Sequence, residues 1–196
     1  DQRGGPFAFR VPPEFCAFPV GPEEREVPCA HSEKAIMLCK AAAMGDQCSY
    51  AQVASLGGDA HPSEVKALGR RIKGFSQPLW DSIVCSVAFE VVHQKFQKTP
   101  SLQPVLMRTG DRLIAEATRN DRNWGIGIDV GDPRVGRPAQ WLGSNILGWA
   151  LMEARAALRQ QLPGAAPAGR ALQADTSGCA AGGGVEPPAA EETAAA

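Results

Sequence analysis

The amino-acid sequence predicts a mainly α-helical fold with little β-structure. In several stretches apolar residues recur every three or four positions, as they do on the buried face of a helix. Pro62 and Pro78 stand where proline suits the first turn of a helix, and Gly45 and Gly74 stand where helices end. The 196 residues, 44% hydrophobic and 21% charged, suffice for one domain with a hydrophobic core.

Five helices and two β-elements are expected along the chain. In the first helix, Ser32 serves as the N-terminal cap and Gly45 follows the last turn. In the third helix, Trp80, Val84 and Val91 belong to a stripe that faces the core. The expected helices cover 32–43, 62–74, 78–98, 105–108 and 144–161, and the expected β-elements are a hairpin at 15–27 and a strand at 113–118.

Composition divides the chain into three parts. Residues 1–13, with paired glycines and paired prolines, form a flexible N-terminal lead-in. Residues 14–162 carry the periodic patterns and form the folded domain. Residues 163–196 are rich in alanine, glycine and proline and cannot bury enough apolar surface to offset chain entropy, so we expect a disordered tail.

Charge and cysteine spacing exclude several classes of protein. A formal net charge of -1 gives no global field for nucleic acid or an acidic membrane, so any polyanion must bind a local patch. No apolar run approaches a membrane span, and the first residues do not resemble a secretory signal, so we expect an intracellular protein, cytoplasmic or nuclear. The six cysteines form no C-x-x-C pair and the three histidines stand far apart, so we expect no metal and no cofactor.

Glu33 and Lys40 are the first candidates for chemistry. Seven residues are nearly two helical turns, so both side chains project from one face, about 10 Å apart along the axis. An acid beside a lysine can carry out acid–base catalysis or form an iminium with an opened sugar. In the alternative interpretation, Glu33 only favours the helix N-terminus electrostatically and Lys40 is solvated.

Two further groups of residues have both a binding and a structural interpretation. Arg70 and Lys73 at the end of the second helix can hold phosphate, or can simply complete a helix C-terminus. Trp124 in the loop 120–140 can stack on a base, or can anchor that loop in the core. Because so long a loop in a compact domain is more often a binding loop than filler, we expect it to contribute to a site.

Short motifs of the chain, taken in order, resemble the NADAR superfamily, also called YbiA-like proteins. They extend over nearly the whole expected domain. The matching residues are Ser32-Glu33 with Lys40, Gly69-Arg70, Trp80, Asn120-Asp121, Trp124-Gly125, Gly127, Gly143, Asn145, Leu147-Gly148, Leu151-Met152-Glu153 and Arg155. The chain departs from the family pattern at Cys16-Ala17, Lys34-Ala35 and Met37, positions that we expect to surround the substrate pocket.

The resemblance implies a fold, an activity and a set of roles. The fold is a compact orthogonal helical bundle, and the activity is hydrolysis of an N-glycosidic bond between ribose and a base. Lys40 would form a Schiff base with the opened ribose, Glu33 would shuttle protons, and Asp121 would orient a hydroxyl or assist proton transfer. Substrate binding would involve Arg70 and Lys73 at phosphate, Trp80 and Trp124 at the base, and Asn120, Gly125 and Asn145 around them.

The resemblance leaves the substrate open. The partner expected first is a nucleic acid or nucleotide that carries ADP-ribose on guanine, which such an enzyme removes. The alternative substrates are ribosylamino-pyrimidine phosphates of the riboflavin pathway. A non-catalytic reader of ADP-ribose is a third hypothesis, against which Glu33, Lys40 and Asp121 argue together because a reader does not need them.

Overall fold

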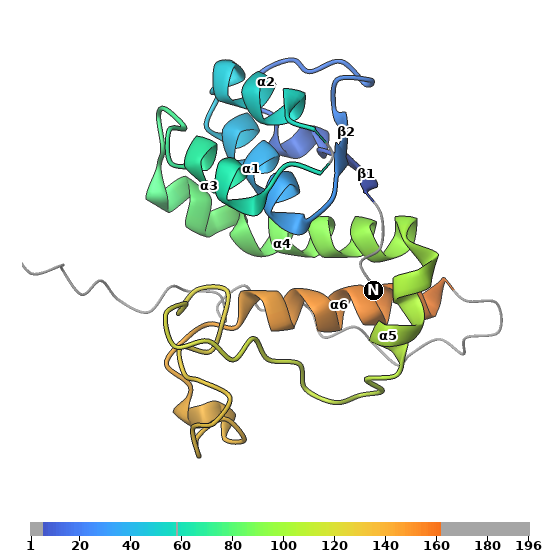
Figure 1. Ribbon diagram of the computed structural model, residues 1–196, viewed down its shortest axis with the longest axis vertical. Helices are drawn as coiled ribbons and strands as arrows, with labels where there is room; N and C mark the ends of the chain where they lie inside the picture. Colours follow the sequence, from blue (N-terminus) through green and yellow to red (C-terminus); the bar gives the residue numbers. More distant parts are fainter. Residues whose placement is uncertain (1–5, 58, 162–196) are drawn as a thin grey trace, which may run out of the picture.

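A computed structural model describes residues 6–57 and 59–161, and in this part of the chain it confirms the mainly helical fold (Figure 1). The predicted tail, 163–196, lies outside the described residues. In chain order the elements are β1 (Phe7–Arg10), η1 (Pro13–Phe15), β2 (Glu26–Cys29), α1 (Ser32–Ala43), α2 (Gln47–Ser55), α3 (Pro62–Gly69), α4 (Gln77–Lys98), η2 (Pro100–Leu102), α5 (Gln103–Met107), η3 (Pro138–Gln140) and α6 (Ile146–Gln160).

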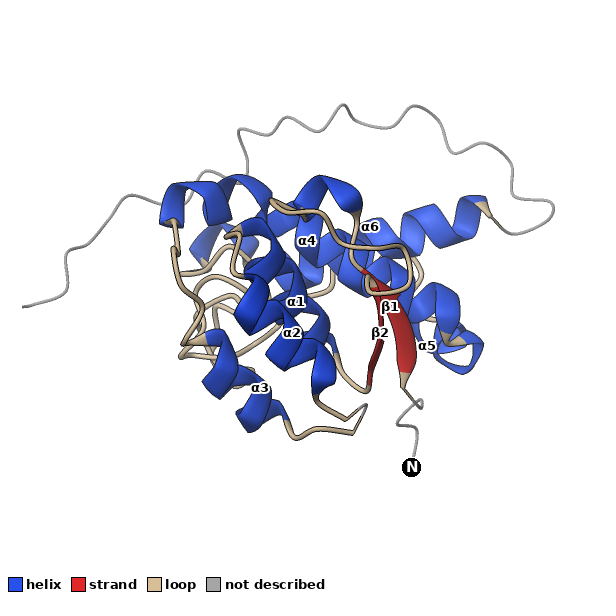
Figure 2. Cartoon of the chain, turned by 90° about the horizontal axis from the view of Figure 1, so that it is seen from above, coloured by secondary structure: helices blue, strands red, loops and turns tan. Residues whose placement is uncertain are grey.

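Helix α4 is the central element of the fold. Helices α1 to α3 and the small sheet lie on one side of it and α6 lies on the other, as the two ribbon views show (Figures 1 and 2). Val87 and Val91 point into a core shared with α1, α2 and the sheet. Val84, Ala88 and Val92 point into a second core shared with α6. Because α4 buries two stripes, it is apolar around much of its circumference rather than along one face.

The long helix begins and ends as its sequence suggests. The Ser76 hydroxyl accepts a hydrogen bond from the Leu79 amide at 3.4 Å, and Pro78 occupies the first turn. Helix α3 begins with a capping box, in which His61 takes the cap position and Glu64 bonds back to the His61 amide. The prediction for α1 is wrong in one detail: His31 occupies its cap position, Ser32 is already helical, and neither side chain caps the helix.

The β-structure differs from the predicted β-elements. The sheet pairs Phe7 with Cys29 and Arg10 with Glu26 in antiparallel register, so β1 lies within the expected lead-in and the predicted hairpin at 15–27 is wrong. The sequence from Phe7 to Arg10 forms a strand because it alternates: the rings of Phe7 and Phe9 face the core, while Ala8 and Arg10 face outward. Residues 113–118 form no strand, since their backbone groups bond to a side chain and to a loop instead of a neighbouring strand.

Helix α2 was not predicted, and the second predicted helix ends at Gly69 instead of residue 74. Asp46 explains the start of α2, because its carboxylate accepts a hydrogen bond from the Ser49 amide at 3.0 Å. The other oxygen of Asp46 accepts from the Lys73 amide at 2.7 Å. One buried carboxylate therefore joins the corner between α1 and α2 to the segment that leads into α4.

Lys34 is a structural residue, although it stands beside Glu33. Its side chain is 1% exposed, and its ammonium donates to the carbonyls of Pro28 at 2.9 Å and Leu56 at 2.7 Å. These bonds connect β2, α1 and the end of α2, and they satisfy a charge that burial would otherwise make costly. The departure from the family pattern at Lys34 therefore affects how β2, α1 and α2 pack together.

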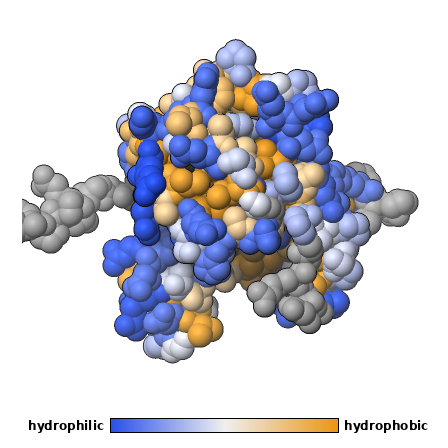
Figure 3. Space-filling view, turned by 45° about the horizontal axis from the view of Figure 1, so that its top comes forward, coloured by the Kyte–Doolittle hydropathy of each residue, from blue (hydrophilic) through white to orange (hydrophobic). Residues whose placement is uncertain are grey.

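On the face shown in Figure 3, hydrophilic side chains surround an apolar area near the centre. Phe75 and Leu79, just before and within the first turn of α4, are among the large apolar side chains that remain exposed. None of the helices in the described ranges has the length and hydrophobicity that a bilayer crossing requires.

Replacing Asp46 with alanine should lower the free energy of unfolding by about 1–3 kcal/mol near pH 7, because the cap of α2 and the bond to the Lys73 amide are lost together. These hydrogen bonds lower the pKa of Asp46 from 3.8 to about 2. A folded-state pKa below the unfolded one adds stability above 3.8, and this contribution disappears as the pH falls toward 2. Chemical denaturation at about pH 7 and about pH 3 measures both effects; a difference between wild type and variant that does not shrink in acid contradicts the assignment.

Candidate functional site

A cavity of about 570 Å³ lies between α1, α4, the first turns of α6 and the loop that precedes α6. This volume is within the range of about 300–1,000 Å³ found for small-molecule sites. Apolar and aromatic side chains form most of its wall and six ionisable side chains interrupt it. The lining residues are Ser32, Glu33, Ile36, Met37, Lys40, Lys66, Trp80, Val92, Lys95, Phe96, Glu116, Asp121, Trp124, Leu147 and Leu151.

Helix α1 supplies one whole wall of the cavity. Glu33, Ile36, Met37 and Lys40 follow one another at intervals of three, one and three residues, so they occupy a single face. The opposite face of α1 is buried in the first core, which fixes the rotation of the helix. The structure therefore brings Glu33 and Lys40 to the same cavity, as their spacing predicted.

The ammonium of Lys40 lies beneath two aromatic rings. Its Nζ is 4.3 Å from the centroid of the Phe75 ring and 5.8 Å from that of Trp80. Burial lowers the pKa of Lys40 below its usual value of 10.5, while the charge of Glu33 opposes the shift. Lys40 thus loses its proton more readily than a solvated lysine, and the nearby carboxylate is close enough to interact with it.

Glu33 has a second lysine beside it. The Nζ of Lys66, on α3, is 3.9 Å from Oε2 of Glu33, at the edge of ion-pair distance. Helices α1 and α3 can approach closely here because Gly69 has no side chain. A Cβ at that position would lie 2.1 Å from the sulfur of Met37. The glycine of the Gly69-Arg70 motif therefore serves helix packing at the wall of the cavity.

Asp121 and Trp124 belong to one tight turn. Oδ1 of Asp121 accepts hydrogen bonds from the amides of Asn123 at 3.0 Å and Trp124 at 2.8 Å. Trp124 is partly buried and contacts both hydrophobic cores while one side of it lines the cavity. The binding and anchoring interpretations of Trp124 thus both describe its position. The other oxygen of Asp121 is left for the cavity.

Close backbone contacts hold this turn against the start of α6. A Cβ at Gly125 would lie 2.8 Å from the Glu116 carbonyl, and one at Gly143 would lie 2.3 Å from the Gly125 carbonyl. The amide of Asn145 also donates to the Gly125 carbonyl at 3.0 Å. Gly125 therefore contributes by having no side chain, and it does not itself line the cavity.

Asn145 is buried and joins the loop to α6 through its side chain. Its Oδ1 accepts from the Glu116 amide at 3.0 Å and its Nδ2 donates to the Ile114 carbonyl at 2.9 Å. Its backbone adopts the left-handed conformation, with φ of 53°, which asparagine tolerates better than most residues. Asn145 was expected at the substrate, but these bonds make it a brace of the loop, and it does not line the cavity.

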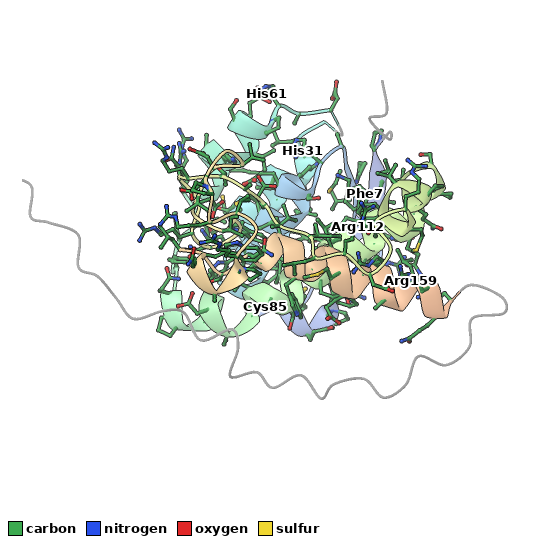
Figure 4. All side chains as sticks on the ribbon, turned by 90° about the horizontal axis from the view of Figure 1, so that it is seen from below. Phe7, His31, His61, Cys85, Arg112 and Arg159 are labelled. Carbon is green, nitrogen blue, oxygen red and sulfur yellow. The ribbon has the colours of Figure 1, made fainter. Side chains whose placement is uncertain are left out.

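The other end of the same connection is fixed on the last turns of α6. Arg159 donates to Oδ1 of Asp111 at 2.6 Å and to the Gly110 carbonyl at 2.7 Å, and Arg155 donates to the Arg112 carbonyl at 3.0 Å. Figure 4 shows Arg112 and Arg159 near each other at this end of the molecule. Both ends of the long segment before α6 are therefore held by α6.

Besides Gly125 and Asn145, which hold the loop, three more of the predicted binding residues do not line the cavity. Arg70 and Lys73 are exposed around the end of α3 and do not line it, which corresponds to their structural interpretation. Asn120 is exposed on the loop, next to Asp121 but outside the cavity wall. The predicted residues that do line the cavity are Glu33, Lys40, Trp80, Asp121 and Trp124.

Besides apolar wall residues, three ionisable residues that line the cavity and one aromatic residue beside it were not predicted. Lys66, Lys95 and Glu116 line it, and Phe75 covers Lys40. Lys95 lies fifteen residues after Trp80 on α4, a spacing that brings it only roughly to the same side, and nothing in its local sequence distinguishes it from Lys98. Only the packing of α1 and α3 against α4 and the loop brings these side chains together.

Cys16-Ala17, the first of the departures from the family pattern, lies at a different cavity. Cys16, Ala17, Phe18 and Arg25 line a separate hollow of about 450 Å³ near η1. The expectation that the departures surround the substrate pocket therefore applies to Met37 and not to Cys16-Ala17. Within the described ranges, no group of three or more His, Cys, Asp or Glu side chains is arranged to hold a metal ion.

Replacing Asn145 with glycine should lower the free energy of unfolding by about 1–3 kcal/mol, because two buried backbone groups lose their partners while the left-handed backbone remains easy to adopt. Asn145→Ala should cost more, since alanine adds strain of about 1–2 kcal/mol in that conformation. Denaturant unfolding of the three proteins measures these differences. If the Asn145→Gly variant has the same free energy of unfolding as the wild type, the side-chain bonds do not hold the loop.

Comparison with known proteins identifies relatives of this fold and sequence. The NMR structure of the E. coli protein YbiA superimposes with a TM-score of 0.54 over 69% of this chain and 70% of that one, at 23% identity, and so shares the fold. N-glycosidase R617 of Acanthamoeba polyphaga mimivirus is 32% identical over 63% of this chain and 71% of its own length. N-glycosidase Npun_R5314 of Nostoc punctiforme is 33% identical over 53% of this chain and 59% of its own length.

A maize relative has a different name and a much longer chain. The chloroplastic riboflavin biosynthesis protein PYRR of Zea mays is 32% identical over 56% of this chain, which corresponds to 16% of that protein. The NADAR domain matches residues 11–159 of the present chain, and this range includes every residue that lines the cavity. This protein belongs to the NADAR domain family.

Proposed function

We propose that this protein is an N-glycosidase that removes ADP-ribose from ADP-ribosylated guanine in nucleic acid or nucleotides. The N-glycosidase class is supported by the viral and cyanobacterial relatives of that name. The observation that carries the proposal is the joint position of Glu33 and Lys40 on one face of α1, in a cavity that also contains Asp121. The names of these relatives support the class of reaction, and the identity of the base is the more specific part of the proposal.

Lys40 acts as the nucleophile in the proposed reaction. Its neutral amine attacks C1″ of the ribose, the bond from C1″ to the base nitrogen breaks, and the base leaves with a proton. Opening of the ribose ring gives an imine between Lys40 and C1″. Water then adds to the imine, the bond from C1″ to Nζ breaks, and ADP-ribose is released. The lowered pKa of Lys40 favours the neutral amine that the first step requires.

Glu33 handles the protons of both steps. It can give a proton to the departing base and take one from the attacking water, since it lies on the same face as Lys40. Lys66 sits 3.9 Å from its carboxylate and helps hold it at the cavity. Asp121, whose Oδ1 is fixed by two amides, presents its other oxygen to a ribose hydroxyl.

The aromatic residues suit a planar leaving group. Trp80 and Trp124 both line the cavity and both also contact a small hollow of about 50 Å³ beside it. A purine or pyrimidine ring can stack on such surfaces with little sequence preference. The two indoles are therefore assigned to the base, as the sequence suggested.

A second candidate substrate is favoured by one observation. The maize relative is named as a riboflavin biosynthesis protein, and the matching region lies within its much longer chain. A ribosylamino-pyrimidine phosphate offers the same bond from ribose to nitrogen and would use the same Glu33 and Lys40. A non-catalytic reader is the less favoured hypothesis, because it leaves Glu33 and a lysine with a depressed pKa without a purpose.

Incubation with ADP-ribosylated guanine in DNA, RNA or a nucleotide should release free ADP-ribose, and turnover should exceed that of a ribosylamino-pyrimidine phosphate. Glu33→Gln should reduce kcat at least about 100-fold and change substrate binding little, because the amide keeps the shape and cannot move a proton. Exposed Glu23→Gln is the matched control and should turn over normally. Faster turnover of the pyrimidine phosphate would move the proposal to the second substrate.

Reduction with borohydride during turnover should trap a covalent ribosyl adduct on Lys40, because hydride converts the imine to a stable amine. Peptide mass mapping locates the modified lysine among the three that line the cavity. Lys40→Arg keeps the positive charge and cannot form the imine, so it should yield neither adduct nor product. An active enzyme that gives no adduct on Lys40 rules out the Schiff-base step.

A further inference from the structure

Lys95 has no assigned task in the reaction described above, yet it forms part of the cavity wall. It lies on α4, in the same turn as Val92 and Phe96, and its side chain is half-buried among them. Within residues 6–57 and 59–161, no hydrogen bond or ion pair engages its ammonium. A half-buried ammonium without such a partner calls for an explanation, since burial of a charge is unfavourable unless a partner compensates for it.

Other lysines of the chain show how the charge is normally satisfied. Lys34 donates to the carbonyls of Pro28 and Leu56, Lys98 donates to the Ala8 carbonyl, and Lys66 lies at ion-pair distance from Glu33. Lys98 is the most informative comparison, because it stands one turn from Lys95 on the same helix and points to β1 instead of the cavity.

The electrostatics of Lys95 agree with its lack of a partner. Burial lowers the pKa of Lys95 below its usual value, and no acidic side chain contributes to the shift. Glu116 also lines the cavity, but its side chain is exposed and does not offset the burial of Lys95. An anion bound beside Lys95 would supply the missing partner and stabilise its positive charge.

The position of Lys95 relative to the candidate chemistry is also informative. Lys40 lies close to Trp80, and Lys95 follows Trp80 by fifteen residues, about 22 Å along the axis of α4. The side chains of Lys40 and Lys95 both reach into this one cavity, Lys40 near Trp80 and Lys95 further along α4. Arg70 and Lys73, which the sequence assigned to phosphate, are outside it.

We propose that Lys95 binds the phosphate carried by the substrate ribose, further along α4 than Trp80. The inference rests on the proposed function, because it takes the ribose to lie between Glu33 and Lys40. A 5-phosphate and the diphosphate of ADP-ribose present the same chemistry to an ammonium. Lys95 thereby places C1″ of the ribose within reach of Lys40 and takes no part in bond breaking.

Calorimetric binding of ribose, ribose 5-phosphate and ADP-ribose tests the inference without turnover. The wild-type protein should bind both phosphorylated probes more tightly than ribose. Lys95→Gln should weaken phosphate binding about 10- to 100-fold and leave ribose binding unchanged, while Lys95→Arg should retain most of the affinity. Lys98→Gln, the matched control one turn away, should bind as wild type does, and thermal unfolding confirms that each variant is folded.

The two phosphorylated probes separate the sources of the phosphate. Loss of affinity for both places Lys95 at the phosphate next to the ribose, and loss for ADP-ribose alone places it at the second phosphate of the diphosphate. If Lys95→Gln binds both probes as wild type does, the inference is wrong. A borohydride adduct on Lys95 would also overturn it, since that result makes Lys95 the nucleophile.

Failure of the proposed function gives a different result. If neither N-glycoside is cleaved but the phosphate preference still depends on Lys95, the phosphate site stands and the catalytic proposal falls. If an N-glycoside is cleaved with an adduct on Lys40 and the Lys95→Gln variant has a normal KM, the catalytic proposal stands and the phosphate site falls.

Discussion

The burial of α4 on two sides is the constraint on which the rest of the structure depends. Val87 and Val91 belong to the core with α1, and Val84 and Ala88 belong to the core with α6, so the helix cannot rotate without exposing one set. The side chains at the border between the two stripes, including Trp80, are directed into the space between α1 and α6. The candidate site is therefore a gap that two separate cores leave along one helix, and its walls are as rigid as those cores.

The loop before α6 closes this gap, and its precision comes from backbone contacts instead of regular structure. Gly125 and Gly143 let the backbone segments approach closer than side chains would allow, and the Asn145 side chain bonds to the segment at 114–116. The residues that present chemistry from this loop, Asp121 and Trp124, are held by hydrogen bonds to main-chain groups. An irregular loop can thus position a catalytic group well when its own polar groups are satisfied.

The sequence predicts local features well and tertiary contacts poorly. Periodicity predicted α1, α4 and α6, and the period of α1 also placed Glu33 and Lys40 together. Helix α2 was missed because its start depends on Asp46, whose second bond reaches a residue far along the chain. Arg70 and Lys73 looked suited to phosphate because charge clusters can be recognised in a sequence, whereas the burial that distinguishes Lys95 arises only when α1, α4 and the loop pack together.

The cavity contains three lysines in three electrostatic settings, and these settings decide which role each can take. Lys66 lies beside Glu33 and remains largely exposed, so it is best suited to hold that carboxylate. The pKa of Lys95 is shifted by burial alone, with no contribution from an acidic side chain, so Lys95 suits binding of an anion better than proton-coupled chemistry. Burial lowers the pKa of Lys40 although the charge of Glu33 opposes the shift, and Glu33 stands on the same helical face as a group that can carry a proton. Among the three lysines, this combination best suits the proposed reaction, in which the amine attacks as a neutral nucleophile and is later released by water.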